Sequence, residues 1–129
     1  LTKMLDVNFI IIWGNQFEKK LAYKISSNSP NTNVSERLSL SELISLISKI
    51  DLVIGGDTGP THLAWGLNIP SITLFGSTPG YRNTVTSKKN LIIESKSAVN
   101  PNTINKKDLS IQEIKVTDVL DATFKLLKI

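Results

Sequence analysis

The feature that most constrains the fold is a stretch where an apolar run meets a tight glycine-containing turn. The run at 52–56 (LVIGG) leads directly into the hexapeptide at 57–62 (DTGPTH), where a short helical segment begins. Pro60 suits the first turn of a helix, where its missing N–H costs no hydrogen bond. A buried strand, a tight loop and a helix in this order are typical of the repeating unit of a parallel sheet.

The same alternation runs along most of the chain. We expect strands at 8–13, around Val34, at 52–55, at 71–75 and at 91–93. We expect helices at 16–26, from Ser39 to about 50, at 60–67 and at 117–127. Strands and helices that alternate with short connections predict an α/β fold, a Rossmann-like open parallel sheet with helices on both faces.

Three of the expected helices carry apolar side chains on one side, which we expect to be buried. The side chains of the first are Phe17, Leu21, Ala22 and Ile25. Those of the second are Leu40, Leu43, Ile44, Ile47 and Ile50, and those of the last are Val116, Val119, Leu120, Phe124 and Leu127. Ser39 and Glu42 have the spacing of a capping box at the start of the second helix.

Three loops follow the carboxyl ends of expected strands, at 13–14, 57–59 and 76–78. Ligands of open parallel sheets bind beyond these strand ends. We therefore expect the three loops to share one rim of the sheet.

The loop at 57–59 has the chemistry of an anion site. Free backbone N–H groups and the positive end of a helix dipole converge there, which suits a phosphate or a diphosphate. Asp57 and Thr58 can cap the helix or bond a ligand, and His62, the only histidine, can donate to a phosphate oxygen. The alternative is a well-formed turn without a ligand, with a structural His62. No Walker-type loop and no GxGxxG motif is present.

Two charged residues near the other loops have two interpretations each. Glu18 either interacts with the dipole of its own helix or accepts hydrogen bonds from sugar or ribose hydroxyls. Arg82, after Tyr81, either contacts a phosphate or is a solvated loop residue. One histidine without cysteine makes a poor metal site, so we expect no bound metal.

Length and composition narrow the class of protein. A chain of 129 residues, 40% hydrophobic and 20% charged, suits one soluble domain, and the absence of cysteine excludes disulfides. No apolar run approaches the ~20 residues of a membrane span. The net charge of +4 indicates a solvated lysine-rich surface, with a polyanionic partner or an anionic membrane surface as the alternative. No basic helix or stacking platform indicates a nucleic-acid partner.

The segment 51–80 resembles the donor-binding core of the ADP-heptose:lipopolysaccharide heptosyltransferases, glycosyltransferase family 9. The matching elements are Asp-Thr-Gly at 57–59, His-Leu at 62–63, Pro70, Phe-Gly at 75–76, Thr78, and Trp-Gly at 13–14 followed by Glu18. The resemblance implies that residues 1–129 are the nucleotide-sugar binding domain, the carboxyl-terminal half of a two-domain GT-B glycosyltransferase without its amino-terminal acceptor domain.

The resemblance also implies roles for individual residues. Asp57 and Glu18 would contact hydroxyls of the heptose and the ribose, and the turn at Leu38 would lie against the adenine. The segment 58–62, with Thr58, Gly59, Pro60, Thr61 and His62, would hold the diphosphate. His62 would also stabilise the leaving ADP.

The implied reaction transfers heptose from ADP-heptose to a lipid-anchored acceptor in the lipopolysaccharide inner core. It needs no metal, since no Asp-x-Asp pair is present. The general base would lie in the missing half, so we expect this chain alone to be inactive. The resemblance suggests a cytoplasmic location, with a peripheral contact at the cytoplasmic face of the inner membrane as the variant.

The chain departs from the family pattern at Ser77–Gly80, where an expected Asp is missing. Two other functions stay open. One is a sugar-nucleotide epimerase of GT-B shape, and the other is a nucleotide-binding module without catalysis.

Overall fold

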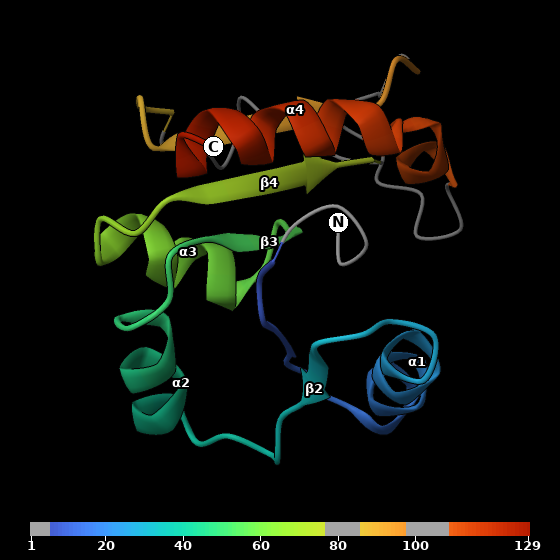
Figure 1. Cartoon of the computed structure of the whole chain (residues 1–129), viewed down its shortest axis with the longest axis vertical. Helices are drawn as coiled ribbons and strands as arrows, with labels where there is room; N and C mark the ends of the chain where they lie inside the picture. Colours follow the sequence, from blue (N-terminus) through green and yellow to red (C-terminus); the bar gives the residue numbers. More distant parts are fainter. Residues whose placement is uncertain (1–5, 77–85, 98–108) are drawn as a thin grey trace, which may run out of the picture. The chain divides into compact units, whose positions relative to one another are not determined.

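The computed structural model describes residues 6–76, 86–97 and 109–129 (Figure 1). The chain divides into two compact units, Leu1–Glu42 and Leu43–Ile129. Each unit is described by itself below.

The first unit is a strand–helix–strand motif. Strand β1 (Phe9–Ile11) pairs in parallel with β2 (Thr32–Val34), and helix α1 (Gln16–Ser26) connects them. The helix has the predicted bounds because Asn15 caps it. The Oδ1 atom of Asn15 accepts from the N–H of Glu18 at 2.9 Å, and Oε2 of Glu18 accepts from the N–H of Gly14 at 2.7 Å.

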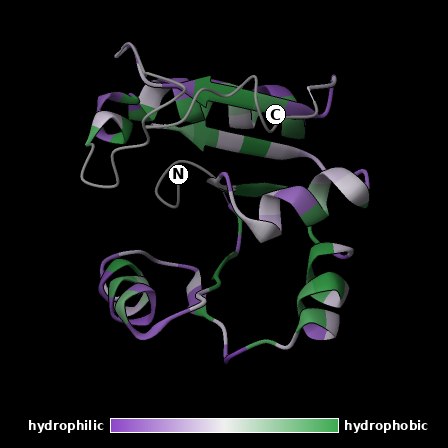
Figure 2. Cartoon of the chain, turned by 180° about the vertical axis from the view of Figure 1, so that it is seen from behind, coloured by the Kyte–Doolittle hydropathy of each residue, from purple (hydrophilic) through white to green (hydrophobic). Residues whose placement is uncertain are grey.

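The apolar side of α1 is mostly exposed, contrary to the sequence prediction. Ala22 is buried, whereas Phe17 is 78% exposed, Leu21 48% and Ile25 45%. Two strands of three residues are too short to cover a helix of 11 residues. The ribbon of α1 accordingly alternates between hydrophobic and hydrophilic colours in Figure 2. Periodicity identified the apolar side of this helix but not the layer that would cover it.

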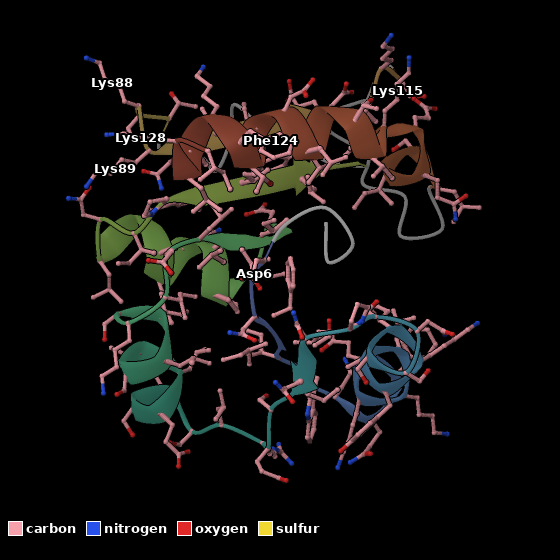
Figure 3. The ribbon with its side chains drawn as sticks, viewed as in Figure 1. Asp6, Lys88, Lys89, Lys115, Phe124 and Lys128 are labelled. Carbon is pink, nitrogen blue, oxygen red and sulfur yellow. The ribbon has the colours of Figure 1, made fainter. Side chains whose placement is uncertain are left out.

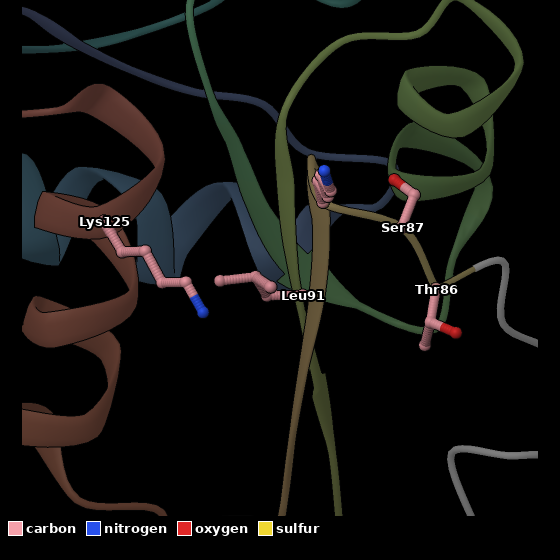
Figure 4. Close-up of a pocket in the computed structure, with 5 residues that line it drawn as sticks. Thr86, Ser87, Leu91 and Lys125 are labelled. Atoms are coloured by element: carbon pink, nitrogen blue, oxygen red, sulfur yellow. The ribbon is translucent and has the colours of Figure 1, made fainter.

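The second unit is built on a parallel sheet of three strands in the order β3–β4–β5. The strands are β3 (Val53–Gly56), β4 (Ser71–Phe75) and β5 (Asn90–Glu94), and Val53, Ser71 and Asn90 stand in register. Helix α3 (Gly59–Gly66) packs on β3 and β4, and α4 (Val116–Leu127) packs on β4 and β5. Figure 4 shows α4 and α3 on opposite sides of the strands.

The remaining elements of this part of the chain are α2 (Leu40–Ile47) and the 3-10 helix η2 (Ser110–Glu113). The sequence analysis missed η2. Strand β4 ends against it, since a Cβ on Gly76 would lie 2.7 Å from the Cβ and 2.8 Å from the backbone N of Ile111. Only glycine therefore fits at position 76.

The α/β class and the parallel direction of all five described strands are confirmed. The strands form two sheets, one of two strands and one of three, where the sequence analysis expected one. In the described residues, each pair of hydrogen-bonded strands lies within one unit.

The core of the second unit lies between α2, α3 and the sheet. Its buried residues are Ile47, Val53 and Ala64, with the partly buried Leu43, Ile50, Leu63 and Ile69 packed against them. The predicted burial of three other apolar residues is wrong, since Leu40 is 68% exposed, Ile44 37% and Val116 71%. Leu40 and Val116 are the first residues of their helices, one turn short of the packed surface.

The predicted capping box of α2 is confirmed. Oε2 of Glu42 accepts from the N–H of Ser39 at 2.7 Å, and the N–H of Glu42 donates to Oγ of Ser39 at 3.3 Å. In α4, Phe124 lies on the side of the helix that faces β4 (Figure 3).

Candidate functional site

The site is built on the turn between β3 and α3. The N–H of Thr58 donates to the carbonyl of Gly56 at 2.9 Å, and the backbone of Thr58 is extended, with φ −142° and ψ 170°. Thr58 is the N-cap of α3, and Thr58 and Thr61 form a reciprocal capping box. The helix therefore begins at Gly59, immediately beyond the carboxyl end of a buried strand.

The hydroxyl of Thr61 is committed to holding this turn. Thr61 is fully buried, and its Oγ1 lies 2.7 Å from the carbonyl oxygens of both Gly56 and Thr58 and 3.3 Å from the N–H of Thr58. A Cβ at Gly55 would lie 3.2 Å from Cγ2 of Thr61, so the glycine makes room for this side chain. Thr61 fixes the loop from inside, and its hydroxyl faces the protein.

The side chains of Asp57 and His62 form a hydrogen bond at the mouth of the turn. The Nε2 atom of His62 lies 2.7 Å from Oδ1 of Asp57. The side chain of His62 is 47% exposed and that of Asp57 is 17% exposed. The imidazole is thus open to solvent at the start of α3, as an anion-binding role requires, and the sequence analysis did not predict its pairing with Asp57.

A residue that the sequence analysis missed lies against the imidazole. The indole ring of Trp65 stacks on His62, with centroids 4.6 Å apart and an interplanar angle of 27°. Residues three apart on a helix are neighbours, so the i, i+3 spacing of His62 and Trp65 was the available signal.

The first turn of α3 differs from those of the other helices in its charge. It contains no acidic residue, whereas α1 has Glu18, α2 has Glu42 and α4 has Asp118. Gly59 is exposed and Pro60 has no N–H. The positive end of the α3 dipole is therefore not balanced by a carboxylate within its own first turn.

Two predicted site residues belong to the first unit. Glu18 is exposed and uses one carboxylate oxygen to cap its own helix, and Leu38 is half-buried in the segment between β2 and α2. In the same unit, Nε1 of Trp13 donates to the carbonyl of Ser35 at 2.8 Å, and Nζ of Lys19 lies 4.7 Å from the Trp13 ring centroid. That Glu18 and Leu38 share a site with His62 stays a prediction.

The structure therefore brings together Asp57, Thr58, Gly59, Pro60, Thr61 and His62 at one helix start. The predicted loop at Ser77–Gly80, with Tyr81 and Arg82, lies outside the described residues. Within the ranges that are described, no three acidic or histidine side chains gather as metal ligands would.

A separate hollow of about 550 Å³ opens at the amino-terminal end of β5. It is lined by Thr86, Ser87, Lys88, Leu91 and Lys125 (Figure 4). Lys89 and Lys128 extend from the same end of the unit (Figure 3). Because parallel strands start at one edge and end at the other, this lysine-lined hollow lies at the edge opposite the start of α3.

The family model of glycosyltransferase family 9 (heptosyltransferase) matches residues 3–112. The chain is 38% identical over 120 residues to the lipopolysaccharide heptosyltransferase 1 of Campylobacter coli. This alignment covers 89% of this chain and 35% of that protein. The chain is 34% identical over 70 residues to the enzyme of the same name from Pseudomonas aeruginosa, across 54% of this chain and 20% of that protein.

Two structures of the E. coli heptosyltransferase WaaC have the same fold. One holds ADP-2-deoxy-2-fluoro heptose and matches 91% of this chain and 33% of that chain, with a TM-score of 0.65 at 20% identity. The other holds ADP and matches 96% of this chain and 36% of that chain, with a TM-score of 0.66 at 19% identity. These matches agree with the Rossmann-like α/β class predicted from the sequence.

The Campylobacter coli protein and the two WaaC structures match most of this chain. The chain spans only about a third of the length of each of them. None of the helices in the described ranges has the length and apolar character needed to cross a bilayer.

Proposed function

Since this chain belongs to glycosyltransferase family 9, the heptosyltransferases, we propose that it supplies the nucleotide-sugar site of such a transferase, as the carboxyl-terminal, donor-binding half of a GT-B enzyme. The substrate is ADP-heptose, and the acceptor is a sugar hydroxyl of the lipid-anchored lipopolysaccharide inner core. The observation that carries the proposal is the solvent-accessible imidazole of His62, paired with Asp57 at the start of α3.

The chemistry that this pair can assist is departure of ADP. The bond between C1 of heptose and the diphosphate oxygen breaks, and its electron pair stays on the diphosphate. The acceptor oxygen bonds to C1, and its proton goes to a base outside this chain. Donors that already point to the place where negative charge grows lower the barrier without reorganisation. The start of α3 and the imidazole of His62 are such donors.

The pairing with Asp57 specifies the form of His62 that acts. When Nε2–H donates to Asp57, a neutral ring leaves Nδ1 as an acceptor, which cannot bond a phosphate oxygen. A doubly protonated ring donates Nε2–H to Asp57 and Nδ1–H to the diphosphate. We therefore propose that Asp57 accepts from Nε2–H of the ring whose Nδ1–H bonds the diphosphate, in addition to the donor hydroxyl contact that the family resemblance implies.

The finer roles in this proposal follow the family pattern. Glu18 bonds a hydroxyl of the donor, and Leu38 packs against the adenine. The helix start and His62 neutralise the diphosphate, so the reaction proceeds without a metal. We propose a cytoplasmic location for the enzyme, and a lipid-anchored acceptor favours the variant with a peripheral contact at the inner membrane.

Substituting His62 tests this function in the transferase that carries the chain. We expect His62→Ala to lower kcat by about 10²-fold, the effect of removing one charge-stabilising donor, with a smaller loss in ADP affinity. Steady-state kinetics and calorimetric titration with ADP measure the two quantities. Lys88→Ala, at the opposite edge of the sheet, is the control and should leave both unchanged.

Equal losses in turnover and in ADP affinity would argue against a role in the transition state. Titration of the 129-residue chain with ADP, ADP-heptose and UDP-sugars separates the alternatives. Preference for UDP-sugars would favour an epimerase, and ADP binding without heptose transfer by the protein that carries this chain would favour a non-catalytic module.

A further inference from the structure

A continuous series of side-chain contacts connects the exposed imidazole of His62 to the buried interior. The ring stacks on Trp65, whose Nε1 donates to Oγ of Ser71 at 3.1 Å. Oγ of Ser71 also accepts from Nδ2 of Asn90 at 2.9 Å. These contacts therefore run from α3 through the first residue of β4 to the first residue of β5.

Several hydrogen bonds hold the buried end of this series of contacts, at Ser71 and Asn90. Ser71 is fully buried and Asn90 is 6% exposed. The side-chain amide of Asn90 also donates to the carbonyl of Ile69 at 3.2 Å, while its Oδ1 accepts from Oγ of Ser87 at 2.8 Å. The Ile69 carbonyl can only accept, so it fixes which end of the amide faces Ser71. Breaking any of these bonds would leave a buried polar group unpaired.

The position of the indole follows from this anchor. Oγ of Ser71 has two acceptor lone pairs, and the N–H groups of Asn90 and Trp65 use both. The bond from Nε1 to Ser71 fixes the direction in which the partly buried indole points. Its face is then the surface on which the imidazole of His62 rests.

The imidazole gains from such a surface. The side chain of His62 is 47% exposed, and the bond to Asp57 fixes one ring nitrogen but leaves the ring plane some freedom to tilt. A stacked indole removes this freedom, and its π face attracts a cation more than a neutral ring. Both effects favour the charged, oriented ring that the proposed function requires.

We propose that Trp65 is a positioning residue, anchored through Ser71 and Asn90, that holds the imidazole of His62 toward the donor diphosphate. This inference rests on the proposed function, since it acts only through His62. Trp65 itself touches neither substrate nor reacting atoms in this role.

A double-mutant cycle in the transferase that carries the chain tests the proposal. Trp65→Leu keeps an apolar side chain but removes the aromatic face, and we expect a loss of about tenfold in kcat with little change in KM for ADP-heptose. Trp65→Phe restores a face and should recover most of that loss. In the His62→Ala background, Trp65→Leu should have no further effect, because the partner is absent.

The outcomes separate the two claims. If His62→Ala leaves kcat unchanged, the proposed function fails. If His62→Ala impairs the enzyme but Trp65→Leu does not, or if Trp65→Leu costs as much with His62 absent, the positioning role is overturned. An equal loss for Trp65→Phe and Trp65→Leu would also overturn it.

A second measurement covers the case in which Trp65→Leu fails to fold. His62 is the only histidine of the chain, so its ring protons are identified in the NMR spectrum of the 129-residue protein without ambiguity. Stacking on the indole should shift these signals upfield of those of a free histidine. Signals at the free-histidine position would show that the stack does not form in solution, and would refute the inference without any variant.

Discussion

The start of α3 differs from the starts of α1 and α2 in the side chains that bond its backbone groups. Side chains satisfy backbone groups at each helix start, through a capping box in α2 and α3 and through Asn15 and Glu18 in α1. In α1 and α2 one of these side chains is a carboxylate, Glu18 or Glu42, which also balances the helix dipole. In α3 the box contains two threonines and no charge. The comparison shows that a helix start can be capped without placing a carboxylate in its first turn.

The position of Asp57 sharpens this comparison. A carboxylate is present near the start of α3, but it precedes the N-cap and pairs with His62. It therefore bonds the imidazole, whereas Glu18 and Glu42 accept from backbone amides that immediately precede their own helices. The two threonines hold the turn, and the proposed donor to the diphosphate is the imidazole that pairs with Asp57.

The largest expected effect tests whether the neutral box maintains the loop. Thr61→Val has nearly the same shape but removes a buried hydroxyl that contacts Gly56 and Thr58. We expect it to lower the free energy of unfolding by about 1–3 kcal/mol, since buried backbone groups lose their partner. Urea denaturation of the chain measures this, with Thr117→Val, an exposed change in α4, as the control. A loss no larger than the control's would show that the hydroxyl does not hold the turn.

The next effect comes from giving α3 the charge that α1 and α2 carry. A side chain fits at Gly59, since a Cβ there has no atom within 4 Å. Glu at this position should stabilise the helix by about 0.3–1 kcal/mol through the dipole. The same carboxylate would repel a diphosphate, so we expect Gly59→Glu to weaken ADP binding about tenfold relative to the neutral Gly59→Gln.

Calorimetric titration with ADP compares the Gly59→Glu and Gly59→Gln variants, and thermal unfolding checks their stability. The effect on affinity should shrink as salt is added, because exposed charges are screened. Equal affinities for the two variants would mean that the diphosphate binds elsewhere.

The sequence analysis predicted correctly those features that depend on interactions between residues close in sequence. It failed where burial depends on residues far apart in sequence. The bounds of α1 and β4 and the box at Ser39 and Glu42 depend on neighbours a few residues away, and all were predicted. The exposure of Phe17 and Leu40 depends on which layers cover each helix, and was not. Local patterns determine the type of an element, and long-range packing determines its burial.

The candidate site divides in the same way. The glycine turn, the helix start and the place of His62 follow from six consecutive residues, and the sequence was sufficient to find them. The stack on Trp65 depends on helical spacing alone, yet aromatic residues on helices more often pack in cores. The anchor at Ser71 and Asn90 depends on the register of two strands, which the sequence does not specify.

The smallest effect concerns the charged box of α2, in the pH dependence of stability. Hydrogen bonds from the side chain and then the backbone N–H of Ser39 hold the pKa of Glu42 below its ordinary value of 4.5. A carboxyl whose pKa is lower in the folded state stabilises the fold above the unfolded value, and loses this effect as the pH falls through the folded value. Glu42→Gln should therefore be less stable than the parent at about pH 7, and this difference should shrink at a pH well below the ordinary value of 4.5. Other carboxyls titrate alike in both proteins, so urea midpoints at the two pH values isolate Glu42. A stability difference that persists unchanged at the lower pH would assign it to side-chain geometry, and the contrast between charged and neutral boxes would then lose its electrostatic basis.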